Sequence, residues 1–162
     1  MDVNAGGDIY WKAASFGGSQ EVFVSLVNID PASVEVDLLL KSQSAVTWSA
    51  LIEVWYDATV KRVQVWTYTA SQGWVQRGAD IPVTLVNGDQ FGGRATADGK
   101  VSVYRNGVLL GVRDVTGWPN AAAGGYIGVW LISSSASLVD NFGGGNMAAG
   151  LTPTPTSTAT LP

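Results

Sequence analysis

The sequence contains neither cysteine nor histidine among its 162 residues. Without cysteine the chain has no disulfide bonds and no thiolate metal ligands. Without histidine it lacks the commonest general base and the commonest metal ligand of proteins. These two absences exclude catalysis by a Ser-His-Asp triad or by a Cys-His pair.

Charge is also scarce. Asp, Glu, Lys and Arg make up 14% of the residues and leave a net charge of −4, whereas a typical domain has about a quarter charged residues. Nucleic acid is not expected as a partner, because neutralising phosphates requires a basic surface. Ser, Thr, Asn, Gln and Gly must keep the surface hydrated, which suits a secreted or cell-surface protein, contact with glycans, or packing against copies of itself. No apolar run is long enough to span a bilayer.

The chain is rich instead in short runs where apolar and polar residues alternate, which is the period of a β-strand. The run Val36–Ser42 is almost continuously apolar and predicts a buried strand. Tight-turn dipeptides at 87–88, 98–99 and 106–107 separate several runs. No segment shows a helical period. The pattern therefore predicts an all-β, antiparallel two-sheet sandwich or jelly roll with almost no helix.

The clearest alternation lies in a predicted hairpin formed by 51–57 and 62–68. Period-two spacing gives this hairpin an aliphatic face that needs a core. Its other face mixes aromatic and hydrogen-bonding side chains, namely Glu53, Trp55, Asp57, Arg62, Gln64, Trp66 and Tyr68. Because polar residues share that face with the indoles, we expect it to meet solvent.

The composition changes after the three glycines at 143–145. We therefore predict one jelly-roll domain over residues 1–145 and a Thr/Pro-rich linker or tail over 146–162. The Thr/Pro tract has no core-forming residues, and it suits an extended linker that carries O-linked sugars in a secreted protein. A disordered spacer explains the same composition equally well.

The order of the motifs resembles that of the concanavalin A-like lectin/glucanase jelly rolls, in particular the laminin-G-like and pentraxin-like modules of bacterial secreted proteins. The resemblance covers roughly residues 20 to 143 and is carried by Ile52–Asp57 with Val63–Trp66, Gly88–Ala95, Val101–Gly107, Gly125–Trp130 and Leu138–Phe142. It implies a curved sheet whose concave face binds the ligand. Relatives carry a further amino-terminal strand paired with the last strand. This chain starts late by comparison, which predicts an open sheet edge.

The glucanases that the chain resembles carry Glu-x-Asp-x-x-Glu on one strand, with two carboxylates as nucleophile and acid. The nearest equivalent in the hairpin is Glu53 with Asp57, but four residues along one strand place them roughly 13 Å apart. That separation is too large for a retaining pair. Asp37 or Asp140 could supply a partner, although no spacing points to either. We predict that the protein is not an enzyme.

Carbohydrate binding requires aromatic platforms beside planar hydrogen-bonding groups, because sugars present apolar C–H faces and dense hydroxyls. The predicted ligand-binding residues are Glu53, Trp55, Gln64, Trp66, Tyr68 and Arg94. Trp130 is a further candidate from a neighbouring strand. The loop residues Trp48, Trp74 and Trp118 could line the rim.

Tryptophan in a sandwich more often belongs to the core. For Trp130, which stands among Ile127, Val129 and Leu131, burial in the core is the favoured interpretation. For Trp55 and Trp66 core and platform remain equally open.

Calcium binding occurs in many relatives of this resemblance, but the aspartates are scattered and form no EF-hand loop. We assign no metal ligand and no cofactor, and Asp140 is the first residue to examine. The predicted function is a non-catalytic, extracellular, lectin-like module for a polysaccharide or glycoconjugate. The alternative is a structural or adhesive subunit that assembles with its own copies through an open sheet edge or through the tail.

Overall fold

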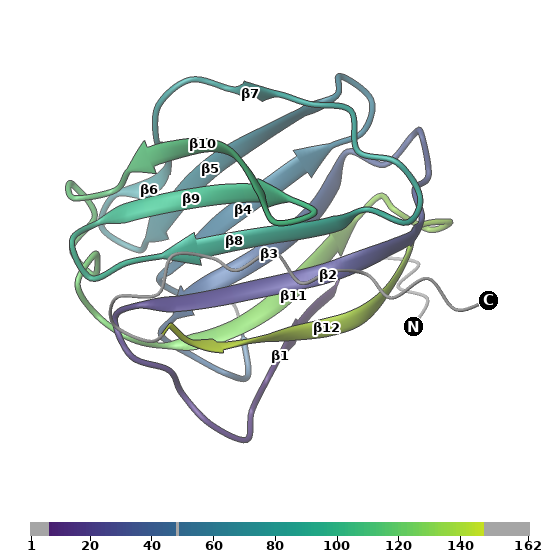
Figure 1. Cartoon of the computed structure of the whole chain (residues 1–162). Coiled ribbons are helices and arrows are strands. Elements are labelled where there is room, and N and C mark those ends of the chain that lie inside the picture. Colours follow the sequence, from purple (N-terminus) through teal and green to yellow (C-terminus); the bar gives the residue numbers. More distant parts are fainter. Residues whose placement is uncertain (1–6, 48, 148–162) are drawn as a thin grey trace.

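The computed structural model describes residues 7–47 and 49–147, and these form two stacked antiparallel sheets without any helix (Figure 1). The first sheet contains, in spatial order, β1 (Gly7–Tyr10), β11 (Tyr126–Ile132), β3 (Glu35–Ser42), β4 (Leu51–Asp57), β5 (Arg62–Thr69) and β6 (Gly73–Gln76), with β7 (Ile81–Pro82) also paired to β5. The second contains β10 (Val108–Asp114), β9 (Lys100–Arg105), β8 (Gln90–Ala95), β2 (Gln20–Asn28) and β12 (Leu138–Asn146). The expected all-β, two-sheet architecture is confirmed.

The tail predicted for 146–162 lies outside the described residues except for its first two positions, and Trp48 also lies outside them. The domain boundary therefore stays a prediction. Since the described residues include no helix, they include none that could cross a membrane.

The core fills the space between the two sheets. Val22, Val24 and Leu26 of β2 face Val36, Leu38 and Leu40 of β3, together with the aliphatic face of the β4–β5 hairpin. These side chains are at most 2% exposed. Alternation thus assigns the core face of the β4–β5 hairpin correctly, because only one parity of each strand can be buried between the sheets.

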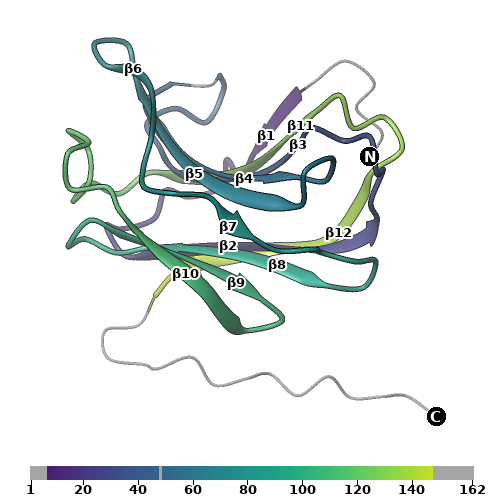
Figure 2. The same cartoon turned by 90° about the horizontal axis from the view of Figure 1, so that it is seen from above.

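The seven-stranded sheet is strongly curved. Figure 2 shows its concave face turned away from the five-stranded sheet, with β6 rising on one side and β1 with β11 on the other. The face of the β4–β5 hairpin that carries its polar and aromatic side chains is this concave face, opposite the core.

In the described part of the chain, β1 and β12 are edge strands of the two sheets. The short β1 pairs with β11, not with the last strand. Within the described part of the chain β12 pairs only with β2, so it ends the five-stranded sheet.

Truncating a core side chain between the sheets should test this packing. Leu38 is fully buried, so Leu38→Ala removes apolar contacts and leaves a cavity, and we expect a loss of about 2–5 kcal/mol in the free energy of unfolding. Leu109→Ala is the matched control, because Leu109 is 51% exposed and should lose no more than about 0.5 kcal/mol. Urea denaturation measures both, and equal losses would contradict the assigned core.

Candidate functional site: an aromatic hollow over buried carboxylates

Strand register aligns the functional side chains in two rows across the concave face. Directly paired residues of antiparallel strands share a face. One row is Asp8, Trp130, Asp37, Trp55 and Gln64, running from β1 through β11, β3 and β4 to β5. The next row is Tyr10, Gly128, Leu39, Glu53, Trp66 and Gln76. Acidic and aromatic residues therefore alternate across the middle of this sheet.

A hollow of about 270 Å³ opens over these rows. Its lining consists of four tryptophans, two glutamates and one aliphatic residue, namely Trp55, Trp66, Trp74, Trp130, Glu35, Glu53 and Ile132. The rings of Trp55 and Trp66 are 6.1 Å apart between centroids and tilted by 40°. Both side chains are half-buried, so neither is sealed in the core.

Sheet curvature brings the two outer indoles together. Trp74 of β6 and Trp130 of β11 are separated by three intervening strands, which would place their backbones roughly 19 Å apart in a flat sheet. Their ring centroids are nevertheless only 6.5 Å apart. The two rings therefore reach toward each other above the floor of the hollow. The expectation that Trp130 belongs to the core is wrong, because its parity on β11 is that of the concave face.

Three carboxylates cluster at the floor, and two of them, Glu35 and Glu53, line the hollow. One oxygen each of Glu35, Asp37 and Glu53 lies within 4.8 Å of the others. Asp37 has no exposed surface, and neither of its carboxylate oxygens has a hydrogen-bond partner. Such an unsatisfied buried group is costly in a native protein and requires an explanation.

Burial shifts the protonation of this cluster. It raises the pKa of Glu53 to about 8, with the charge of Glu35 as a second cause. Burial also raises the pKa of Asp37 well above its ordinary value, with Glu53 and then Glu35 adding to it. The pKa of Glu35 is raised by burial and then by Asp57. Each effect disfavours a negative charge that lacks a counter-charge.

A polar network beside the hollow holds the indole of Trp66 in place. The Trp66 ring nitrogen donates to Gln64 Oε1 at 3.2 Å, and Gln64 Nε2 donates to Asp80 at 2.6 Å. Asp80 also accepts bonds from Gln76 and Arg62, both at 2.8 Å. These bonds, that of Gln64 first, lower the pKa of Asp80. Gln64 therefore uses both ends of its amide to position Trp66.

The polar members of this face are less exposed than expected. Glu53 is 5% exposed and Gln64 is 6% exposed, although both side chains lie on the face of the hairpin away from the core. The indoles and the curvature of the sheet cover them. Tyr68 lies at one side of the hollow, with its ring 5.0 Å from that of Trp74.

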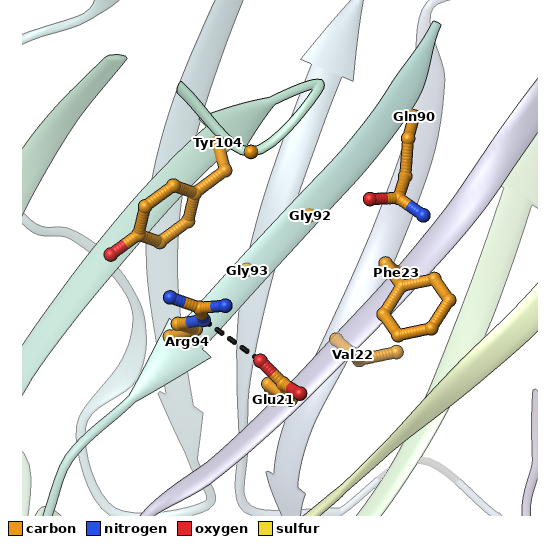
Figure 3. A pocket seen from close by; sticks show the side chains of 9 residues that line it. Glu21, Val22, Phe23, Gln90, Gly92, Gly93, Arg94 and Tyr104 are labelled. Atoms are coloured by element: carbon orange, nitrogen blue, oxygen red, sulfur yellow. Dashed lines mark hydrogen bonds and ion pairs between the residues drawn. The ribbon is translucent and has the colours of Figure 1, made fainter. Parts of the chain in front are cut away.

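Arg94 is not part of this group, so its expected place beside the indoles is wrong. It lies on β8, in the other sheet, and Figure 3 shows it on the outer face of that sheet. Its Nε donates to Glu21 at 2.8 Å, and its guanidinium lies 4.6 Å from the centre of the Tyr104 ring. A shallow depression surrounds it, lined also by Phe23, Gln90 and neighbouring glycines.

Trp118 does not line a rim either. It is 1% exposed within the core, and its ring nitrogen donates to the Tyr68 carbonyl at 2.9 Å. Asp140 lies exposed on β12, and its carboxylate accepts a hydrogen bond from the backbone N–H of Asn141. The acidic cluster of Glu35, Asp37 and Glu53 is thus far in sequence from Asp140, the aspartate first considered as a metal ligand.

Glu35 was missed in the sequence, and Asp37 was considered without support. The sequence signal that could have found them is their position in the strand. Both alternate with Val36 and Leu38, which face the core, so both must lie on the opposite face of the sheet. Parity alone does not reveal that β3 lies directly beside β4. Only that pairing places Asp37 next to Trp55 and close to Glu53.

Known structures share this architecture at low sequence identity. The chain is similar to carbohydrate binding module CBM66 from Bacillus subtilis, with 12% identity, a TM-score of 0.62, and coverage of 89% of this chain and 84% of that one. It is also similar to the galectin LEC-6 from Caenorhabditis elegans, with 12% identity, a TM-score of 0.53, and coverage of 87% and 94%. Alginate lyase A1-II′, a member of polysaccharide lyase family-7, matches at 12% identity and a TM-score of 0.53, over 83% of this chain and 66% of the lyase.

No protein-family model matches the sequence, and no curated protein sequence matches it. The structural likeness establishes the fold, which is a concanavalin A-like jelly-roll sandwich.

The raised pKa of Glu53 predicts how stability depends on pH. The folded protein holds this proton up to about pH 8, whereas the unfolded chain releases it near pH 4.3. The stabilisation is therefore complete below the unfolded pKa and is lost as the pH rises through the folded one. We expect the free energy of unfolding to fall between pH 5 and pH 9 by at least about 1 kcal/mol.

Glu53→Gln should weaken this decline, since the amide does not titrate in that range. Asp140→Asn, which removes an exposed carboxyl, is the control and should keep the decline. Denaturation curves at both pH values give the comparison. A Glu53→Gln protein with the full decline would show that this carboxyl is not its source.

Proposed function

Starting from a concanavalin A-like jelly roll, we propose that the protein is a non-catalytic carbohydrate-binding module, secreted or displayed at the cell surface. Its ligand is a polysaccharide or glycoconjugate bound in the hollow of the concave face. One observation carries the proposal: four indoles, of Trp55, Trp66, Trp74 and Trp130, line one hollow together with carboxylates.

The shape and lining of the hollow suit a saccharide. Its volume of about 270 Å³ lies just below the usual range of small-molecule pockets, roughly 300–1,000 Å³. Indole faces complement the apolar C–H faces of a pyranose ring, and carboxylates accept hydrogen bonds from its hydroxyls. Trp74 at the sheet edge is 38% exposed, so a chain of several sugars could extend past it into solvent.

The structural neighbours support the same class of ligand. They include proteins named as a carbohydrate binding module, a galectin and an agglutinin. Their identities of 12% to 16% support the proposal at the level of carbohydrate in general, not of a particular sugar.

The carboxylate cluster favours binding over hydrolysis. A retaining glycosidase needs one ionised carboxylate that can reach the sugar and one protonated carboxyl as acid. Glu35, Asp37 and Glu53 all have raised pKa values, and Asp37 has no exposed surface. Glu53 therefore holds its proton near neutral pH, and Asp37 cannot reach a sugar, so neither is set up as an ionised nucleophile. Although a lyase shares the fold, we propose no catalytic residue.

Removing one indole should abolish glycan retention. Trp66→Ala deletes a half-buried ring of the hollow, and we expect polysaccharide affinity to fall at least about tenfold. Folding should survive, because the ring lies outside the core. Affinity electrophoresis against a panel of polysaccharides measures the change.

Two matched variants sharpen this experiment. Trp11→Ala removes a 49% exposed indole that does not line the hollow, and it should retain binding. Arg94→Ala tests the outer face of the opposite sheet and should also retain binding. Equal mobility of Trp66→Ala and the parent on every retained polysaccharide would overturn this site.

A structural or adhesive subunit is the second candidate, and one observation favours it. The edge strand β10 exposes Val108, Leu109 and Val112, which are 66%, 51% and 44% accessible. An apolar edge strand invites pairing with another chain. Self-association in sedimentation velocity that Leu109→Lys abolishes would support assembly. A monomer at all concentrations would exclude it.

A further inference from the structure

The carboxylates at the floor of the hollow have no counter-charge in the described part of the chain. No Lys or Arg forms an ion pair with Glu35, Asp37 or Glu53. Of the cations on the neighbouring strands, Lys41 donates its ammonium protons to the carbonyls of Thr96 and Ala121, and Arg62 is paired with Asp57 at 3.9 Å and with Asp80 at 2.8 Å. Both oxygens of the fully buried Asp37 remain without a donor. The cluster therefore requires a positively charged hydrogen-bond donor from outside the protein, or bound protons in its place.

We propose that the hollow selects an amino sugar, whose protonated primary amine binds Glu35 and Glu53, with Asp37 buried beneath them, while its ring stacks on the indoles. The inference rests on the proposed carbohydrate-binding function and specifies its ligand class. The lining joins two features that a neutral sugar does not need together: an acidic floor and walls of four tryptophans.

The geometry of the floor fits an ammonium nitrogen. One oxygen of Glu35 and one of Glu53, which both line the hollow, lie within 4.8 Å of each other, so a nitrogen between them can lie about 2.8 Å from both. That distance equals a charge-assisted N–H···O bond. A primary ammonium has three N–H donors, so it can bond to Glu35 and Glu53 at once and keep one donor for solvent or sugar.

The walls distinguish an ammonium from other cations. Calcium takes six to eight oxygen ligands at shorter distances of 2.3–2.6 Å. Above the floor the lining offers indoles and Ile132, which supply no oxygen ligands. A quaternary ammonium would gain cation–π attraction from the indoles but has no N–H to donate to Glu35 and Glu53. A protonated amine uses both the aromatic walls and the acceptors.

The protonation of the free cluster supports this inference. Burial raises the pKa of Glu53 to about 8, so near neutral pH this carboxyl holds a proton that a bound ammonium would displace. Binding should therefore release protons. The other titratable or charged groups on or beside this face, among the described residues, are Asp8 and Tyr10 of β1, Tyr126 of β11, Asp57 of β4, Arg62 and Tyr68 of β5, and Asp80, which is bonded to Gln64.

The test compares three tetrasaccharides with the same β-1,4 linkage that differ only at carbon 2. These are the tetramers of glucosamine, of N-acetylglucosamine and of glucose. Isothermal titration at pH 6.5 keeps most of the amine protonated. We expect the glucosamine tetramer to bind at least about tenfold more tightly than either other ligand. Its binding should release protons, measured as a dependence of the heat on the ionisation enthalpy of the buffer.

Three variants identify the residues. Glu53→Gln and Glu35→Gln keep the side-chain shape and should each reduce the preference for the amine. Glu21→Gln removes the same charge from the outer face of the other sheet and should leave the preference unchanged. Thermal unfolding of each variant establishes that it is folded.

Each contrary result is distinct. Equal affinity for the three tetramers would overturn the amine preference and leave carbohydrate binding standing, as would tighter binding of a neutral tetramer. If calcium chloride alone binds to the protein and this binding is lost in Glu53→Gln, the floor is a metal-ion site and the inference is overturned. Failure of every glycan, neutral or cationic, would overturn the proposed function itself.

Discussion

The curvature of the seven-stranded sheet is the constraint on which the rest of the structure depends. It brings Trp74 and Trp130, three strands apart, to 6.5 Å between ring centroids. A flatter sheet would spread these indoles and leave a polar surface. With the observed curvature the same side chains enclose a hollow and exclude water from the carboxylates beneath it, which accounts for the raised pKa values.

This arrangement opposes stability, and the sandwich core offsets it. An acidic side chain such as Asp37, buried without a partner, is destabilising, and so is its proximity to two further carboxyls. Asp37 lies on β3, and the opposite face of that strand supplies Val36, Leu38 and Leu40 to the core. One strand thus contributes to stability on one face and to the site on the other. A costly polar cluster that persists on a well-packed scaffold is typical of a binding site.

Alternation in the sequence predicted the fold class, the core face of the hairpin and the side-by-side placement of Trp55 and Trp66. It did so because each strand has only two faces and the core takes one. It did not predict strand neighbours, which depend on contacts between residues distant in sequence. For that reason Arg94 was grouped with residues of the other sheet, and Glu35 was missed although its parity was correct. Trp118, in an irregular segment without alternation, gave no parity signal at all.

The central claim is that the aromatic hollow of the concave face binds the ligand. The indole N–H resonances in a ¹H–¹⁵N correlation spectrum test it most directly, because tryptophans on different parts of the molecule report separately. On titration with a retained glycan, the account predicts shifts for Trp55, Trp66, Trp74 and Trp130 and none for the core residue Trp118. Unchanged signals from the four hollow residues, with perturbations around Arg94 and Tyr104 on the opposite sheet, would contradict it.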